Sequence, residues 1–246
     1  MILSDNRKVV LIMKNFFAIL GGMGTLATTN FLVELNKKHT PTKDQDFFNY
    51  MLFNHAEIPD RTLYILDNSA PSPLPALLAD IEQLNSLKPD FIVIPCNTAH
   101  YFINDLINAT SIPIINMIKE TVATIPSNTT KKIGLAVTQG TLDSQLYEQE
   151  LIFNGHEVIL PDATLQHKIN ELVYTYLKEQ AIINHLLYQE ILEEFQQLGS
   201  DITLLGCTEL SLANSHDPLK KFPVIDAEEI LLEKTYQLAQ QLKLKV

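Results

Sequence analysis

Short apolar runs alternate with longer amphipathic segments along this chain. The runs are continuous and rich in β-branched residues, and polar residues do not alternate within them. This pattern is typical of parallel strands that are buried on both faces. It predicts strands at Phe16–Leu20, Tyr50–Asn54, Asp90–Pro95, Ile112–Asn116, Lys132–Val137, Glu157–Pro161, Ile202–Gly206 and Phe222–Asp226.

The segments between the runs carry helical patterns. Apolar residues from Leu74 to Leu84 recur at the spacing of one helix face. A second pattern, Gln145–Phe153, ends just before Gly155, which suits the position after a helix C-terminus. Alternating strands and helices predict an α/β fold whose functional loops lie at the carboxyl ends of the strands.

The chain also repeats itself. "DFIVIPCNT" resembles "DITLLGCT", and the offset from Cys96 to Cys207 is 111 residues (207 − 96). "IPIIN" resembles "FPVID" at an offset of 110 (222 − 112), and "GTL" occurs twice at an offset of 116 (140 − 24). Three similar offsets in the same order indicate a duplicated α/β half. We therefore expect two pseudo-symmetric lobes, each a parallel sheet of about four strands flanked by helices, with the active site between them.

We predict a first lobe of residues 14–116 plus 225–246, a second lobe of residues 117–224, and an N-terminal extension of residues 1–13. The apolar stretch "VVLIMKNFFAIL" could instead belong to a signal peptide. Lys14 and Asn15 interrupt it, which favours reading "FFAIL" as a first strand and Met13 as an alternative start. A cytoplasmic location is expected.

Composition narrows the classes of partner. The 246 residues carry a net charge of −11 with a pI near 5.0, so no basic field is available for nucleic acid or an anionic membrane. Two cysteines make at most one disulfide and are too few for a thiolate zinc site unless histidines help. His55 and His156 show no metal-ligand spacing, so we expect neither a metal nor a nucleic-acid partner.

Each cysteine ends a hydrophobic strand, precedes a predicted helix and has a threonine close behind it. That position faces the ligand crevice of an α/β sheet, and helix N-terminal amides there lower a thiol pKa. A lone buried cysteine is more often a small hydrophobic residue that fills space. The symmetric pair formed by Cys96 and Cys207 favours a chemical role instead.

Two opposed thiols suit proton transfer at a stereocentre. A thiolate removes the proton from one face while a thiol delivers a proton to the other face. Backbone amides at helix N-termini can bind the substrate carboxylate and stabilise the developing charge.

Other groups are predicted near the same cleft. "LGGMGTLATTNF" places glycines and Thr25 between the first strand and a helix, where backbone can approach an anion closely. Arg61 in "IPDRT" offers a bidentate fork for a carboxylate, or an ion pair with a neighbour such as Asp60. Thr138 and Thr141 in "VTQGT" can bind a carboxylate or cap a helix.

Two further residues follow the cysteines. His100 lies four residues after Cys96 and either assists that thiol or has a structural role. Glu209 lies two residues after Cys207 and can tune the thiol, contact an ammonium group, or remain a solvated carboxylate.

The segments "GGMGTLAT", "IPDRT", "PCNTAH", "TQGT" and "GCTEL", in this order, resemble the aspartate/glutamate racemase family, and the aspartate racemase branch in particular. The resemblance covers about Phe16 to the C-terminus. It implies a cofactor-independent racemase, free of pyridoxal phosphate, which is often a dimer and acts on a small acidic amino acid.

By this resemblance Cys96 and Cys207 match the paired acid/base residues. The substrate-binding positions that it implies, or that lie in the loops above, are Met23, Thr25, Asn54, Arg61, Asn97, Thr98, Thr138, Thr141, Thr208 and Glu209. Gly22, Met23 and Glu209 stand where glutamate racemases carry other residues, which favours the aspartate branch. Thr25 replaces the usual proline of the first loop, and Lys178 is the base nearest to a position that is often lysine.

Two alternative functions remain open at this point. One is a cysteine-dependent isomerase or decarboxylase of small dicarboxylates such as maleate, although a decarboxylase needs only one cysteine. The other is a bilobal small-molecule binding protein without catalysis.

Overall fold

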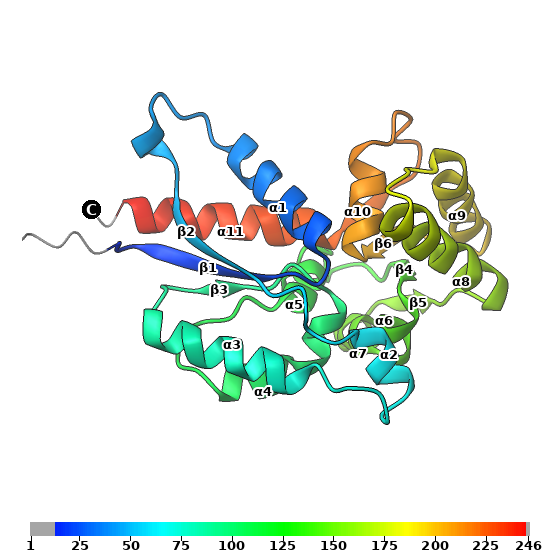
Figure 1. The fold of residues 1–246 in the computed structure, drawn as a ribbon. Helices are drawn as coiled ribbons and strands as arrows, with labels where there is room; N and C mark the ends of the chain where they lie inside the picture. The colour runs from blue at the N-terminus through cyan, green and yellow to red at the C-terminus, as the bar shows by residue number, and fades with distance from the viewer. Residues whose placement is uncertain (1–12, 245–246) are drawn as a thin grey trace, which may run out of the picture.

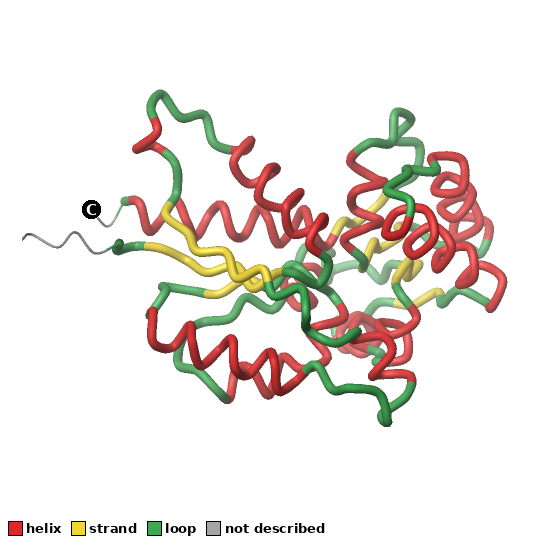
Figure 2. The backbone as a smooth tube through the Cα atoms, viewed as in Figure 1, coloured by secondary structure: helices red, strands yellow, loops and turns green. Residues whose placement is uncertain are grey.

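The structure, a computed structural model, describes residues 13–244 and contains two separate parallel sheets (Figures 1 and 2). The first sheet has the order β2-β1-β3 and is made of β1 (Phe16–Gly21), β2 (Asn49–Asn54) and β3 (Ile92–Val93). The second has the order β5-β4-β6-β7 and is made of β4 (Lys132–Val137), β5 (Glu157–Ile159), β6 (Ile202–Gly206) and β7 (Val224–Asp226). The predicted α/β class with two parallel sheets is confirmed.

Helices connect these strands on both faces of each sheet. Those before β4 are α1 (Thr25–Lys38), η1 (Asp44–Asp46), α2 (Arg61–Leu66), α3 (Leu74–Leu87), η2 (Thr98–Phe102), α4 (Ile103–Asn108) and α5 (Met117–Ala123). Those after β4 are α6 (Gln139–Asp143), α7 (Leu146–Phe153), α8 (Ala163–Asn170), the π-helix η3 (Glu171–Glu179), α9 (His185–Gln197), α10 (Thr208–Ser215) and α11 (Ala227–Lys243). The predicted helices match α3 and α7, and Gly155 follows α7 with a φ of 84°.

One strand prediction is wrong. The segment Ile112–Asn116 forms only an isolated bridge between Ile114 and Ile92, so the first sheet has three strands rather than about four. Pro113 has no N–H to extend the ladder, and Asn116 already caps α5 by accepting from Lys119 N. The other predicted strands are present but shorter where they included a proline, at residues 95, 161 and 223.

In the first sheet, alternate side chains enter two different core layers, as period-2 geometry requires. On one face Phe17 and Ile19 pack with Phe31 and Leu35 of α1. On the other face Ala18 and Leu20 pack among buried leucines and isoleucines of α3 and α4. Both faces of β1 are therefore buried, which explains its unbroken apolar sequence.

The second sheet is layered in the same way. Leu135 and Leu204 face a core shared with α5, α7 and α11. Their neighbours Ala136 and Leu205 face a core built from α8, η3, α9 and α10. The first of these cores also contains β1 residues, so one apolar layer runs between the two sheets.

The C-terminal helix α11 returns toward the first sheet and packs against α1 and α5 (Figure 1). This packing supports the predicted assignment of residues 225–246 to the first lobe, although the lobe boundaries stay a prediction. Residues 1–12 of the predicted extension lie outside the described residues. Within residues 13–244, no helix has both the length and the apolar character that crossing a bilayer requires.

Candidate active site

Both cysteines lie beyond the carboxyl ends of strands, Cys96 after β3 at the edge of the first sheet and Cys207 after β6 inside the second. Cys207 follows β6 directly and is the N-cap residue of α10. Cys96 follows β3 after two intervening residues and precedes η2. Both thiols are free and buried, and both line one small cavity. The two sequence motifs thus meet at one place.

The cavity takes residues from both halves of the chain. Its lining consists of Asp60, Arg61, Thr62, Cys96, Asn97, Thr98, Thr138, Tyr174, Lys178, Cys207, Thr208 and Glu209. Its volume is about 20 Å³, which is room for about one water molecule. An amino acid is several times larger, so binding one requires the surrounding loops or lobes to move apart.

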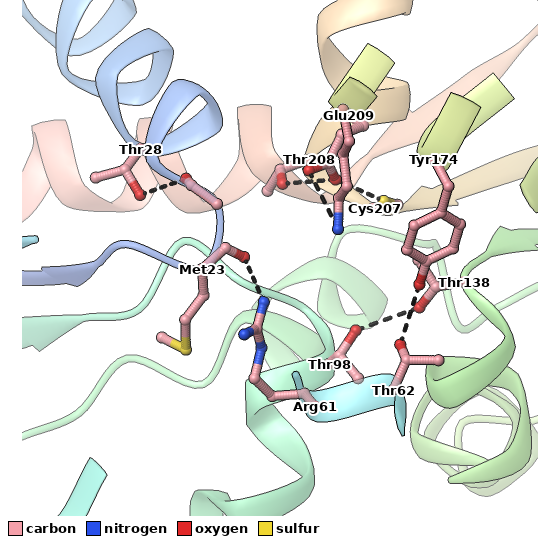
Figure 3. A network of polar contacts seen from close by, with 12 residues as sticks. Met23, Thr28, Arg61, Thr62, Thr98, Thr138, Tyr174, Cys207, Thr208 and Glu209 are labelled. Atoms are coloured by element: carbon pink, nitrogen blue, oxygen red, sulfur yellow. Dashed lines mark hydrogen bonds and ion pairs between the residues drawn. The ribbon is translucent and has the colours of Figure 1, made fainter. Parts of the chain in front are cut away.

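The Cys207 thiol is hydrogen-bonded to the carboxylate of Glu209. Its Sγ donates to Glu209 Oε2 at 2.9 Å, and Thr208 Oγ1 donates to the same oxygen at 3.3 Å (Figure 3). Burial, followed by the Glu209 carboxylate, raises the pKa of the Cys207 thiol well above its usual range, while Lys178 opposes the shift. Cys207 is therefore protonated at neutral pH, and Glu209 tunes the thiol, as one of the sequence-based readings expected.

The π-helix η3 supplies two further groups. Lys178 Nζ lies 3.6 Å from Glu209 Oε1 and 4.8 Å from the centre of the Tyr174 ring. Burial disfavours the charge on Lys178, but the nearby Glu209 and Cys207 outweigh it, so the Lys178 pKa is raised. Tyr174 in turn donates to Thr62 Oγ1 at 3.3 Å. The lysine that the sequence offered as the nearest base therefore belongs to the site.

Arg61 is buried and forms no ion pair within the described residues, so the alternative reading, an ion pair with Asp60, is not observed. Its guanidinium donates to the carbonyls of Met23 at 3.0 Å, Pro59 at 3.1 Å and Ile58 at 3.4 Å. The Asp60 carboxylate instead caps α2 by accepting from Leu63 N. Arg61 thus fastens the first glycine loop to the start of α2.

Two donor atoms in the cavity wall lack partners within residues 13–244. They are Arg61 Nε and Asn97 Nδ2, and both are buried. The amide oxygen of Asn97 is occupied, because Tyr147 OH donates to it at 2.5 Å. Buried donors are rarely left unsatisfied, so these two atoms mark where an anionic group can bind.

Three threonines join the halves of the chain. Thr98 Oγ1 lies 3.2 Å from Thr138 Oγ1 and 2.9 Å from Thr141 Oγ1. Thr138 also caps α6 by accepting from Thr141 N at 3.4 Å, so its capping role is confirmed. Thr138 lines the cavity, whereas Thr141 lies behind it.

His100 has a structural position. Its Nε2 accepts from Met117 N at 3.0 Å, so the proton is on Nδ1, which donates to Cys96 O at 2.9 Å. Burial lowers the His100 pKa and keeps the ring neutral. The ring therefore fixes the backbone at Cys96 and has no free nitrogen for the thiol.

The first glycine loop lies at the edge of the site. Thr25 and Asn54 are exposed and lie 3.4 Å apart through Oγ1 and Nδ2, outside the cavity lining. Met23 contributes its carbonyl to Arg61 rather than its side chain. Gly22 has a φ of 93°, and a Cβ there would lie 2.5 Å from the His55 backbone, so only glycine fits.

Thr62, Tyr147 and Tyr174 are the residues of the site that the sequence patterns did not single out. Thr62 stands within the quoted "IPDRT" segment, and Tyr174 precedes Lys178 by four residues. Their roles follow from the contact between halves of the chain, which no local pattern reports. Within the described part of the chain, no group of three or more His, Cys, Asp or Glu side chains is placed to hold a metal ion.

Paired buried thiols between two α/β lobes, with donors for an anion beside them, define a class of protein suited to proton transfer on a small acid. Comparison with known proteins agrees. The Asp/Glu/Hydantoin racemase profile matches residues 20–235, and the chain belongs to this family. Family membership supports amino-acid racemase activity.

Individual relatives place the chain within the family. The "Broad specificity amino-acid racemase RacX" of Bacillus subtilis is 29% identical over 228 residues, covering 88% of this chain and 95% of its own. The structure of the Picrophilus torridus aspartate racemase superposes with a TM-score of 0.77 at 28% identity, covering 92% of this chain and 94% of that chain. A glutamate racemase from Bacillus anthracis, RacE1, shares the fold with a TM-score of 0.63 at 19% identity, covering 92% and 81%.

Proposed function

We propose that this protein racemises aspartate, or a similar acidic amino acid, by proton transfer at Cα between Cys96 and Cys207 without a cofactor. The observation that carries the proposal is the pair of buried thiols, from corresponding strand ends, that line one polar cavity. The likeness to the Picrophilus aspartate racemase supports aspartate as the substrate.

Cys207 is the proton donor in one direction of the proposed reaction. Because burial and Glu209 raise the Cys207 pKa, Cys207 carries its proton, and Cys96 is the base in that direction. Cys96 thiolate removes the α-proton, the electron pair of the C–H bond delocalises into a Cα=C bond with the negative charge on the carboxylate oxygens (an enediolate-like species), and Cys207 then protonates the opposite face of Cα. The thiol and the thiolate have exchanged places, and the reverse reaction restores them.

Hydrogen-bond donors in the wall of the active-site cavity favour an acidic substrate. Arg61 Nε and Asn97 Nδ2 have no protein partner within residues 13–244, and Lys178 adds an ammonium group. Together they can bind a carboxylate and stabilise negative charge as it develops. Loss of one donor that stabilises such a developing charge typically costs about 10²–10³ in rate.

A broader substrate range is a second candidate, because the Bacillus relative is named a broad specificity racemase. Lys178 already faces Glu209, so the charge available to a substrate side chain is partly neutralised. The substrate test therefore includes alanine as well as aspartate and glutamate.

The test follows Cα deuteration by NMR and optical rotation in D₂O, with single enantiomers and no added cofactor. We expect both enantiomers of aspartate to gain deuterium at Cα while the opposite enantiomer accumulates. Cys96→Ala and Cys207→Ala are each expected to abolish the reaction.

Four results would contradict the proposal. Absence of deuterium from aspartate and glutamate would exclude acidic amino-acid racemisation. Near-normal turnover in either cysteine variant would exclude the two-base mechanism, and release of CO₂ would favour a decarboxylase. Ligand binding unchanged by loss of both thiols, without turnover in the intact protein, would indicate a binding protein. The expected homodimer is tested separately by sedimentation.

A further inference from the structure

A second and larger cavity lies between α1, α10 and α11, and it shares no lining residue with the candidate active site. Its volume is about 380 Å³, enough for a small organic molecule. The three helices pack on one another around it, and they converge beside the second sheet in Figure 1. Nothing in the proposed racemisation uses this cavity.

The floor of the cavity is acidic. Asp226, Glu228 and Glu229 line it at the start of α11. Asp226 is fully satisfied, because it accepts from Ser211 Oγ at 2.6 Å, from Asn214 Nδ2 at 3.0 Å and from the first amides of the helix.

Glu228 is different. Its side chain is 4% exposed, and its Oε2 has no hydrogen-bond partner within the described residues. Burying a carboxyl oxygen without a partner costs free energy, so this atom points to a missing donor. The exposed Glu229 beside it is in no ion pair within residues 13–244.

Lysines line the rim, and each already has a partner. Lys37 pairs with Glu34 at 2.7 Å, Lys38 pairs with Glu233 at 2.9 Å, and Lys220 donates to the carbonyl of Asn214. None of them reaches Glu228. The α11 N-terminus adds only about half a positive charge at this end of the cavity.

The acidic side of the cavity therefore lacks a cation, whereas Lys220, whose partners are the neutral oxygens of Asn214, keeps its charge for a carboxylate. We propose that this cavity binds a diamino acid, with an ammonium group at Glu228 and Glu229 and the carboxylate at Lys220. This site does not depend on the racemase reaction.

Two features support the proposal. Burial, followed by Asp226 and Glu209, raises the pKa of Glu228 well above its usual range, so an arriving ammonium group would displace a proton. The cavity also touches the helix that carries Cys207, since Ser211 contacts both Asp226 Oδ1 and the carbonyl of Cys207, at 2.6 and 3.4 Å. A ligand in this cavity can therefore shift the position of Cys207 through Ser211.

The test is isothermal titration of the full chain with L-lysine, with cadaverine as the probe that lacks a carboxylate. We expect L-lysine to bind more tightly than cadaverine, and binding to release a proton, seen as a heat that depends on the buffer. Glu228→Gln should weaken L-lysine at least about tenfold, as loss of a charged hydrogen bond does, and abolish the proton release. The exposed Glu193→Gln is the matched control.

Lys220→Gln gives a second test at an exposed residue that lines the cavity. It should weaken L-lysine but not cadaverine. No binding of L-lysine, unchanged binding in Glu228→Gln, or equal binding of cadaverine would each overturn the proposal. Loss of binding in Arg61→Gln but not in Glu228→Gln would place the ligand in the active site and would overturn it too. Because all readouts are binding, an inactive racemase leaves the outcome unaffected.

Discussion

Replacing Glu209 by glutamine tests whether a carboxylate holds Cys207 in its protonated state. Glutamine keeps the shape of the side chain and can still accept from the thiol, but it removes the negative charge 2.9 Å from Sγ. The amide can also donate to a thiolate. We therefore expect the Cys207 pKa to fall in Glu209→Gln.

The distance sets the size of the effect. Two negative charges 2.9 Å apart repel by about 6 kcal/mol at an effective dielectric constant of about 20. Lys178, which lies 3.6 Å from the other carboxylate oxygen, offsets part of this repulsion. If only about 2 kcal/mol survives, the thiolate population at neutral pH still rises about 30-fold in the variant.

The assay uses the ultraviolet absorbance of the thiolate, which needs no reagent to enter the closed cavity. A Cys96→Ser background leaves Cys207 as the only thiol in the chain. Absorbance is recorded against pH for Glu209, Glu209→Gln and Glu209→Asp. The aspartate variant is the matched control, because it keeps the charge on a shorter side chain and should remain closer to the parent.

A titration midpoint that stays the same in Glu209→Gln, or moves to higher pH, would refute the electrostatic reasoning and leave burial as the sole cause. A midpoint that falls equally in Glu209→Asp would show that packing, not charge, sets the thiol pKa.

Three further variants test two contacts near the site and the titration of Glu228 in the second cavity. Tyr147→Phe removes the donor to buried Asn97 Oδ1 and should lower the free energy of unfolding by about 1–3 kcal/mol in urea titrations; an unchanged midpoint would contradict this. Gly140→Ala places a Cβ 2.7 Å from Thr62 Cα, so we expect lower stability and turnover; wild-type values for both would contradict the close contact. Because the Glu228 pKa is raised in the folded state, the folded chain keeps a proton on Glu228 that the unfolded chain has lost, so stability falls as pH rises above about 4.5. Thermal unfolding of Glu228→Gln as a function of pH should show a smaller fall, and an equal fall would contradict the assignment to Glu228.

The sequence predicts the strands and both thiols because their signals are local. β1 and β6 are short continuous apolar runs, and Cys207 directly follows one of them. The repeat then relates Cys207 to Cys96 across the chain. Ile112–Asn116 misleads because its apolar residues look like a strand, whereas Pro113 and the cap of α5 limit pairing to a single bridge.

The site is less predictable where partners come from distant segments. Arg61 has the sequence context of a carboxylate fork, but three backbone carbonyls occupy it and leave only Nε unpartnered. Tyr174 enters the cavity from η3, whose position depends on packing against α8 and α10. A pattern along the chain cannot report such contacts, because they arise only when the two halves meet.

The duplicated halves have also diverged around their equivalent thiols. The Cys207 thiol donates to a carboxylate that pairs with Lys178, whereas His100 contacts only the backbone carbonyl of Cys96. Because enantiomers have equal free energies in solution, kcat/KM must be the same in both directions of a racemisation, whatever the asymmetry of the site. Under the two-thiol mechanism, the two directions can therefore differ in kcat only if they differ in KM by the same factor. An unequal pair of turnover numbers, balanced by KM, is the kinetic signature that this asymmetric pair of cysteines should give.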